Sequence, residues 1–443
     1  MEDSAPIETE WQKELDIASL LHSYATGSTD VLTVIKRCLN RIEKEDGKYR
    51  SVLHINPHAL EEAQKIDAEF NSIGRLQGPL HGIPVLIKAN IRTKDAMPTS
   101  CGSVILANYM ADEDAAVVQK LRAQGAVILG KTNLSEFCNY VSIETNSGYS
   151  SLGGQTHSIF GPDHAVGGSS SGSAVAAAAN FCSFSIGTET DGSVVYPAAH
   201  NGVFAFKSAK TDDINEGIIG ISKHYDQVGI LSSSLKNLEY AVQCLIQPLP
   251  SSRPTLAWLE TASFGQEASS ENRISRLSTT LTRAGIALQS CDIAQAIEPQ
   301  FPAFDIVCKT EFKHDMVSTL PLPFGEFLSQ SRSGLLHKFH PDIGEIERSL
   351  ASEHAEDGSY AAALSQLLDF RKDWENRLQK AGNPILIAQT TGPSEIASIA
   401  TLLGLSHIVV PWHDPESCLP IGISVMAQTD SLIDVVRIIN SLN

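Results

Sequence analysis

Apolar residues recur at helical spacing near the start of the chain, and short apolar runs follow further along. Between residues 16 and 46 the apolar positions predict two helices, separated by the turn-like residues 25–28. Residues 57–70, rich in Glu and Ala, predict another helix. Residues 82–87 form a short apolar run bounded by Gly and Pro, which is typical of a buried strand.

Helices and strands then alternate. Residues 114–124 predict a helix that ends at Gly125, and the apolar run 126–129 predicts the strand after it. Residues 174–180 are small and apolar, which suits a tightly packed helix, and residues 182–186 alternate as a strand does. This alternation predicts an α/β fold built on a sheet.

The remaining segments of the chain have different patterns. Residues 145–172 are loop-like and dense in Gly, Ser, Thr and Asn. Residues 250–380 predict mostly helices, with a turn-rich break near 320–323. Residues 384–387 and 421–425 predict two late strands. The best candidate for a linker is the break near Arg253-Pro254.

Composition excludes several classes of protein. The 443 residues include 33 Lys+Arg and 51 Asp+Glu, a net charge of −18, and 42% are hydrophobic, which suits a globular protein with a sizeable core. We expect no nucleic-acid partner and no anionic membrane partner, because counterion release needs clustered Lys and Arg. The acidic N-terminus lacks the apolar core of a signal peptide, and no apolar stretch approaches the roughly 18 residues that span a bilayer.

The cysteines also bear on location. None forms a C-x-x-C pair, and no His lies at metal-ligand spacing from them, so we interpret them as reduced core residues and expect a cytoplasmic protein without a metal site. The eight are Cys38, Cys101, Cys138, Cys182, Cys244, Cys291, Cys308 and Cys418.

Residues 125–132 match the phosphate-binding pattern G-x-x-x-x-G-K-[ST] letter for letter. In a phosphate loop a strand precedes the first Gly, and the residues between the glycines form the cradle. Here those residues are Ala-Val-Ile-Leu, which themselves predict a strand. We therefore interpret this segment as a helix–strand junction.

Residues 168–172 contain G-x-S-x-G, the nucleophile-elbow pattern of α/β-hydrolases, with Ser170 as the serine. A helix does follow, but residues 160–164 make a poor strand, and an elbow needs one. A downstream acid and histidine, such as Asp305 and His407, could complete a triad, although any long chain offers such a pair. The elbow stays open as a weaker hypothesis.

A third arrangement combines two serine motifs with a lysine. The run GGSSSGS (167–173) is followed by GTETDGS (187–193), and upstream an apolar strand ends in Lys88. Gly192 allows a tight turn before Ser193, so that successive N–H groups can point at one spot, as an oxyanion hole requires. A lysine at the end of a buried strand is desolvated, which lowers its pKa and makes a neutral amine available as a base.

Together these elements resemble the amidase signature family. The resemblance covers roughly residues 15–245 and thins to scattered matches in the C-terminal half. It rests on PVLIK (84–88), GKTNLSE (130–136), GGSSSGS (167–173) and TETDGS (188–193), with LPIG (419–422) among the scattered matches. Within the family this motif pair is most similar to peptide amidases, which hydrolyse C-terminal carboxamides. Members that deamidate glutamine for tRNA-dependent synthesis more usually carry Gly-Gly before the nucleophile.

The resemblance implies a fold and a domain organisation. The family fold is a large mixed, twisted β-sheet wrapped by α-helices. It implies one amidase-like domain over residues 1–443. Its parts are an N-terminal helical segment (11–70), a signature core (about 80–245) and a divergent helical and C-terminal part (250–443).

The resemblance also implies a Ser-Ser-Lys triad without a metal or organic cofactor. Ser193 would be the nucleophile that forms an acyl-enzyme, and Lys88 would be the base. Ser169, whose backbone is cis in the family, would bridge the two. Backbone N–H groups would stabilise the oxyanion, and the residues of this hole are Thr190, Asp191 and Gly192.

Two segments depart from the family pattern. Relatives usually continue after the nucleophile with Lys-Pro-Thr and a Gly-Arg turn, whereas here residues 206–213 read FKSAKTDD. The small Ser/Pro/Ala-rich segment before the last strand is replaced by residues 403–413 (LGLSHIVVPWH). In relatives these segments flank the pocket, so the resemblance implies an unusual substrate.

Three functions remain open at this stage. The first is a hydrolase that acts on a small-molecule carboxamide or a peptide-like amide. The second is an acyltransferase of a biosynthetic pathway, in which an amine captures the same acyl-enzyme. The third is the glutamine-deamidating component of a tRNA amidotransferase, which would need partner subunits. A homodimer is one option for the assembly.

Overall fold

The computed structural model describes residues 14–142, 144–209, 214–246, 254–265, 268–319, 335–392, 395–412, 419–428 and 432–441, together with residues 326 and 329. The turn-rich break near 320–323 and Arg253 of the linker candidate lie outside the described residues. So do residues 210–213 and His413 of the two departing segments, and Cys418.

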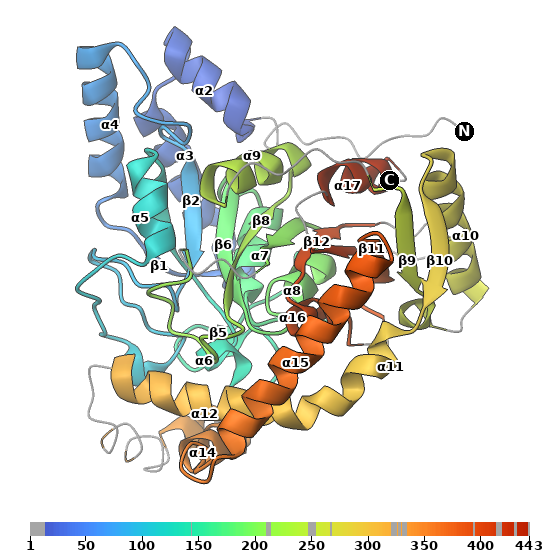
Figure 1. Ribbon diagram of the computed structural model, residues 1–443. Coiled ribbons are helices and arrows are strands. Elements are labelled where there is room, and N and C mark those ends of the chain that lie inside the picture. Colours follow the sequence, from blue (N-terminus) through green and yellow to red (C-terminus); the bar gives the residue numbers. More distant parts are fainter. Residues whose placement is uncertain are drawn as a thin grey trace.

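An 11-stranded mixed sheet runs through the described part of the chain (Figure 1). At one end β3, β2 and β6 are parallel, at the other β11, β9 and β10 are parallel, and the remaining neighbours pair antiparallel. The strand order is β1 (Val52–Ile55), β3 (Val127–Thr132), β2 (Pro84–Lys88), β6 (Phe184–Glu189), β8 (Gln227–Ser232), β7 (Phe204–Lys207), β12 (Ser406–Val410), β13 (Ile423–Ala427), β11 (Ile385–Gln389), β9 (Leu256–Glu260) and β10 (Ala287–Cys291). A separate two-stranded ribbon pairs β4 (Tyr149–Ser150) with β5 (Gly154–Gln155).

Helices wrap this sheet, as the resemblance implied. In Figure 1 the helices α2 to α5 lie beside β1 and β2, and α10 lies beside β10 at the opposite end, while α12 and α14 lie at the bottom and α15 runs diagonally from there up to β11. The α-helices are α2 (Ile17–Thr26), α3 (Val31–Glu45), α4 (Ala59–Ile73), α5 (Ala116–Ala123), α6 (Glu136–Asn139), α7 (Ser171–Ala178), α8 (Val195–His200), α9 (Leu235–Leu245), α10 (Ala268–Arg283), α11 (Ile293–Ile297), α12 (Phe301–Thr319), α14 (Gly344–Leu350), α15 (Ser359–Lys380), α16 (Ile396–Leu403) and α17 (Leu432–Asn440).

Most predicted elements are present. The two N-terminal helices are α2 and α3, and each begins after an aspartate whose carboxylate accepts a backbone N–H, Asp16 from Ser19 and Asp30 from Thr33. The predicted strands at 82–87, 126–129 and 182–186 are β2, β3 and β6, and the small apolar helix is α7. The two late strands are β11 and β13.

The described residues between 250 and 380 are mostly helical, as predicted, but two strands that the sequence pattern missed, β9 and β10, also lie among them. The strand β10 is at the edge of the sheet and is largely exposed, so it lacks the apolar alternation that marks a half-buried strand. The resemblance describes residues 403–413 only as a divergent pocket segment, yet they contain β12, a fully buried strand inside the sheet.

The parallel pair β2 and β6 positions the candidate site. Leu86 lies beside Ser185 and Ile87 beside Ile186, so the two strands end at the same edge of the sheet. Lys88 is the last residue of β2, and Thr188 lies next to the last residue of β6. The segment before α7 crosses this edge and brings the first serine motif to the same place.

Close backbone packing fixes the start of α7. The N–H of Gly172 donates to the carbonyl oxygen of Asn133 at 3.1 Å. A Cβ atom at Gly172 would lie 2.4 Å from the carbonyl oxygen of Ser51 and 2.5 Å from that of Asn133. Only glycine fits here without moving the helix that follows the first serine motif.

We therefore expect Gly172→Ala to lower the free energy of unfolding by roughly 1–3 kcal/mol, the cost of overpacking a tight core. Gly47→Ala is the matched control, because a Cβ atom there meets nothing within 4 Å. Chemical denaturation of both variants measures the difference. Equal stability of the two variants would contradict the role of Gly172.

Candidate active site

Lys88 is fully buried, and its amine makes only neutral contacts among the described residues. Its Nζ donates to Oγ of Ser169 at 2.8 Å, to the carbonyl oxygen of Thr188 at 3.1 Å and to Oγ1 of Thr188 at 3.0 Å. Burial lowers the pKa of Lys88 below that of free lysine. The neutral amine that a base requires is therefore favoured, as the sequence predicted.

A polar network holds the amine in place. Oγ1 of Thr188 also accepts from Nδ2 of Asn90 at 3.0 Å, and the same Nδ2 donates to the carbonyl oxygen of Ile219 at 2.9 Å. Nδ2 of Asn90 also lies 3.3 Å from Sγ of Cys138. Sequence reasoning missed Thr188 and Asn90, although Thr188 lies within the second serine motif.

The two motif serines lie side by side, but only one contacts the lysine. Ser169 is fully buried and follows a cis peptide bond after Gly168. Ser193 is 7% exposed, and its carbonyl oxygen accepts from the N–H of Ser170 at 2.9 Å. Within the described part of the chain, Oγ of Ser193 makes no hydrogen bond. The structure thus joins Lys88 to Ser169 directly and brings Ser193 next to them through the backbone.

The turn before Ser193 presents free donors. Gly192 has φ = +82°, and a Cβ atom there would lie 2.3 Å from the Tyr196 ring, so both conformation and space require glycine. For the N–H groups of Asp191, Gly192 and Ser193 the described residues offer no hydrogen-bond acceptor. Oε2 of Glu189 instead accepts the N–H groups of the two residues after Ser193, at 2.7 and 2.9 Å.

Asp226 holds the turn from the side. Its Oδ1 accepts the hydroxyl of Thr190 at 2.5 Å, and its Oδ2 accepts the N–H groups of Ile221 and Ser222 at 2.8 and 3.0 Å. Burial raises the pKa of Asp226 to about 7, against these hydrogen bonds, which lower it. Asp226 lies 36 residues after Thr190 in the sequence, so no local motif predicts that the two side chains meet.

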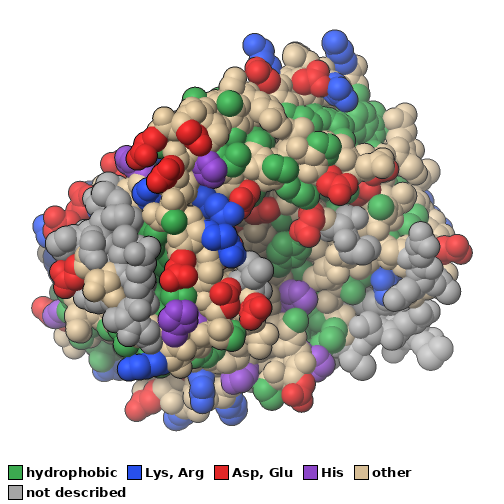
Figure 2. Space-filling view, turned by 90° about the horizontal axis from the view of Figure 1, so that it is seen from below, with side chains coloured by type: hydrophobic (Ala, Val, Ile, Leu, Met, Phe, Trp, Pro, Cys, Tyr) green, Lys and Arg blue, Asp and Glu red, His purple; other side chains and the backbone are tan. Residues whose placement is uncertain are grey.

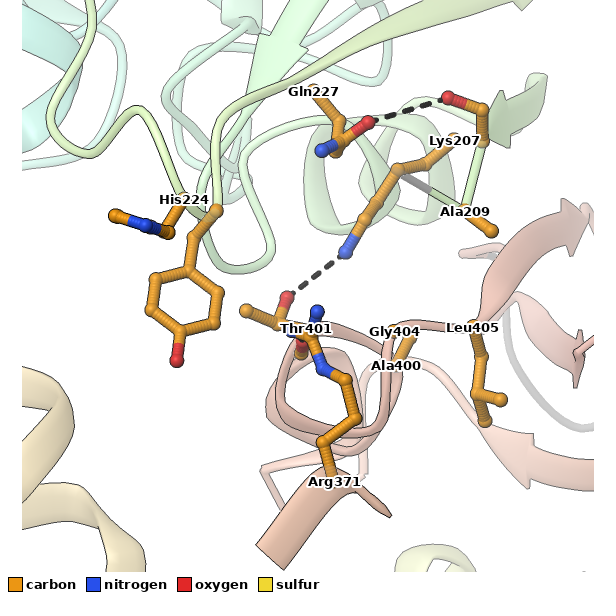
Figure 3. A pocket seen from close by; sticks show the side chains of 11 residues that line it. Lys207, Ala209, His224, Gln227, Arg371, Ala400, Thr401, Gly404 and Leu405 are labelled. Atoms are coloured by element: carbon orange, nitrogen blue, oxygen red, sulfur yellow. Dashed lines mark hydrogen bonds between the residues drawn. The ribbon is translucent and has the colours of Figure 1, made fainter. Parts of the chain in front are cut away.

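Lys207, in the departing segment 206–213, supports the same turn through Glu189 and Thr401. Lys207 is the last residue of β7. Its Nζ lies 3.5 Å from Oε1 of Glu189 and donates to Oγ1 of Thr401 at 2.9 Å. Figure 3 shows Lys207 pointing at Thr401, with Arg371 on the other side of this small pocket. Thr401 in turn donates to the carbonyl oxygen of Thr190 at 3.0 Å. Lys207 is therefore a supporting residue for the turn.

Ser193 and the turn line a cavity of about 560 Å³. Its other walls come mainly from the residues after α6 and from α12 and α16. No described residue of the departing segments 206–213 and 403–413 lines it. The lining residues are Cys138, Asn139, Tyr140, Ser147, Gly168, Thr190, Asp191, Ser193, Tyr196, Ile221, Phe301, Phe304, Asp305, Cys308, Glu395 and Ser398.

The three groups that the nucleophile-elbow hypothesis requires, Ser170, His407 and Asp305, do not contact one another in the structure. The hydroxyl of Ser170 is buried and bonded to the backbone of Thr188, donating to its carbonyl oxygen at 3.0 Å and accepting from its N–H at 3.2 Å. His407 is buried in β12, where Nε2 lies 2.7 Å from Oγ of Ser424. Asp305 lies on α12 and pairs with Lys309 at 2.6 Å. Among the described residues none of these groups contacts the Ser170 hydroxyl.

The phosphate-loop pattern also forms no nucleotide cradle. Its central residues belong to β3, as predicted, and Lys131 is fully buried there. Nζ of Lys131 donates to the carbonyl oxygen of Ile91 and, at 3.2 Å, to Oγ1 of Thr99. Burial lowers the pKa of Lys131 to about 7.

Three further observations concern the described residues only. Nowhere among them do three or more His, Cys, Asp or Glu side chains gather at metal-binding distance. None of the described helices has both the length and the apolar character needed to cross a membrane. The seven described cysteines are free thiols, and two of them, Cys244 and Cys291, are only half-buried, which corrects their interpretation as core residues.

Comparisons with known proteins agree on one family. The family model described as Amidase matches residues 33–289. The native peptide amidase from Stenotrophomonas maltophilia has 30% sequence identity and a TM-score of 0.85, over 98% of this chain and 96% of that chain. An amidase family protein from Bacillus anthracis, at 24% identity and a TM-score of 0.83, has the same fold and covers 97% of this chain and 91% of its own.

Curated relatives match over a shorter region. A protein of Schizosaccharomyces pombe named as an amidase is 38% identical over 226 residues, 51% of this chain and 39% of that relative. A glutamyl-tRNA(Gln) amidotransferase component of Thermobifida fusca is 37% identical over 223 residues, 50% of this chain and 43% of that relative. The matched region thus spans less than half of each relative's own length.

Proposed function

Because the chain belongs to the amidase family, as the match over residues 33–289 and the likeness to peptide amidase over nearly both chains show, we propose that it hydrolyses a carboxamide or peptide-like amide with a Ser-Ser-Lys triad. The observation that carries this proposal is the 2.8 Å contact between Nζ of the buried Lys88 and Oγ of Ser169. That contact lies beside Ser193 and beside a turn with free N–H donors.

In the first half of the proposed reaction, Oγ of Ser193 attacks the amide carbon. Its proton passes to Ser169, whose own proton passes to the neutral amine of Lys88. The N–H groups of the 190–193 turn receive the oxyanion of the tetrahedral intermediate. The intermediate collapses as the C–N bond breaks, and the leaving amine takes the proton back from Lys88 through Ser169. The product is an ester on Ser193.

In the second half, water attacks this ester. Lys88 again accepts a proton through Ser169, and the acid product leaves as the Ser193 hydroxyl is restored. If an amine takes the place of water, the same ester yields a new amide, so acyl transfer shares the first half. The relatives named as components of glutamyl-tRNA(Gln) amidotransferases favour glutamine deamidation as a second candidate. Ammonia release from glutamine, measured on the chain alone, tests that candidate.

Labelling with a fluorophosphonate, followed by mass spectrometry, tests which serine reacts. We expect the label on Ser193 and its complete loss in Ser193→Ala. Ser170→Ala is the matched control and should keep the label, because the hydroxyl of Ser170 is engaged with the backbone of Thr188. A label on Ser170 would instead support the elbow hypothesis and contradict the triad.

The pKa of Lys88 predicts the pH dependence. Because the reaction needs the neutral amine and burial lowers its pKa, the rate should rise with pH and level off below the pH at which free lysine titrates. Lys88→Met should lower the rate by roughly 10²–10⁴, the usual contribution of a positioned base. The measurement is kcat/KM against pH, with folding checked by thermal melt.

Lys131→Met is the control for this assignment. Lys131 is equally buried and its pKa is lowered to about 7, but its amine bonds Ile91 and Thr99 instead of Ser169, so its loss should leave the pH profile unchanged. A folded Lys88→Met protein with the full rate, or a profile that moves only in Lys131→Met, would contradict the role of Lys88.

A further inference from the structure

The cavity that contains Ser193 is lined by acidic side chains and by no basic one among the described residues. Three carboxylates line it: Asp191 beside Ser193, Asp305 on α12 and Glu395 just before α16. Lys309 compensates one of them, since it pairs with Asp305 at 2.6 Å. The other two have no Lys or Arg partner in the described part of the chain.

Asp191 has an oxygen left unsatisfied. Its Oδ2 accepts the hydroxyl of Ser398 at 2.7 Å, but its Oδ1 is buried and has no hydrogen-bond partner among the described residues. Burial, helped by the charges of Glu189 and Glu395 and opposed by the hydrogen bond from Ser398, raises the pKa of this carboxyl to about 6. A buried carboxyl with one unpaired oxygen is costly, and a positive charge in the cavity beside it would lower that cost.

Four aromatic residues also line the cavity. They are Tyr140, Tyr196, Phe301 and Phe304. Ring faces attract cations, and they attract them more strongly where water is excluded. Figure 2 shows the molecule from the side of α12 and α14, where a hollow opens near the centre of the face with both acidic and basic side chains at its rim.

We propose that this cavity selects amides that carry a protonated amine, held by Asp191 and Glu395 and by the aromatic wall. This inference rests on the proposed function, because it names the substrate class of the same site. A neutral amide carries no positive charge for these carboxylates to attract, and an amide that carries a carboxylate would meet like charges. The order of preference is therefore cation, neutral, anion.

Three amides of matched length test this order: 5-aminopentanamide, pentanamide and the monoamide of glutaric acid. We expect kcat/KM for 5-aminopentanamide to exceed that for pentanamide by about tenfold or more. The anionic monoamide should be the poorest substrate. Added salt should narrow the differences, because it screens charge.

Glu395→Gln should reduce the preference for 5-aminopentanamide over pentanamide several-fold, because it removes the charge and keeps the shape. Glu43→Gln is the matched control, since Glu43 is an exposed residue of α3 outside the cavity. A preference that falls equally in both variants would contradict the role of Glu395.

Protection of Ser193 from fluorophosphonate labelling gives a second measurement, which does not require turnover. The cationic amide should protect at a concentration about tenfold lower than the neutral one. If Ser193 is labelled and the neutral or anionic amide is preferred in turnover or protection, this inference is wrong and the proposed function stands. If Ser193 is not labelled at all, both are wrong.

Discussion

The burial of one lysine amine among neutral groups is the constraint on which the site depends. An ammonium ion without a counter-charge is expensive to bury, so the surroundings of Lys88 favour its neutral form. The sheet creates this environment, because β2 and β6 run parallel and end together, with Lys88 on one strand and Thr188 on the other. Oγ of Ser169 lies 2.8 Å from Nζ, within reach of the lone pair that the neutral amine carries. The Ser169 hydroxyl is the route along which we propose that the proton moves.

The turn before Ser193 is rigid because distant parts of the chain hold it. Glu189 caps the residues after Ser193, and Asp226 bonds Thr190. Thr401 bonds the Thr190 carbonyl and is itself bonded by Lys207. These contacts hold Thr190 and the residues after Ser193 in place, while the N–H groups of Asp191, Gly192 and Ser193 have no acceptor among the described residues. A preorganised set of donors is what an oxyanion requires, since it needs no reorganisation when the charge develops.

Sequence reasoning predicted the parts that have local signals. The apolar runs gave β2, β3 and β6 in nearly their observed positions, and the glycine at 192 signalled a turn. The family resemblance, and not spacing, pointed to Lys88, Ser169 and Ser193 as one set. Asp226 and Thr401 had no such signal, because each meets Thr190 across a long separation in sequence. The sequence pattern did not reveal the strands β10 and β12. β10 is largely exposed, so it lacks the apolar alternation of a half-buried strand. β12 is fully buried, but it lies within residues 403–413, which were considered only as a segment that flanks the pocket.

The most direct test of the proton route is a double-mutant cycle on single-turnover acylation. The rate of acyl-enzyme formation from an amide is compared in the natural chain, in Ser169→Ala, in Lys88→Met and in the double variant. If Ser169 and Lys88 act as one relay, either single loss slows acylation severely and the double variant is little slower than either. If the two effects multiply instead, Ser169 and Lys88 act independently and the relay is contradicted.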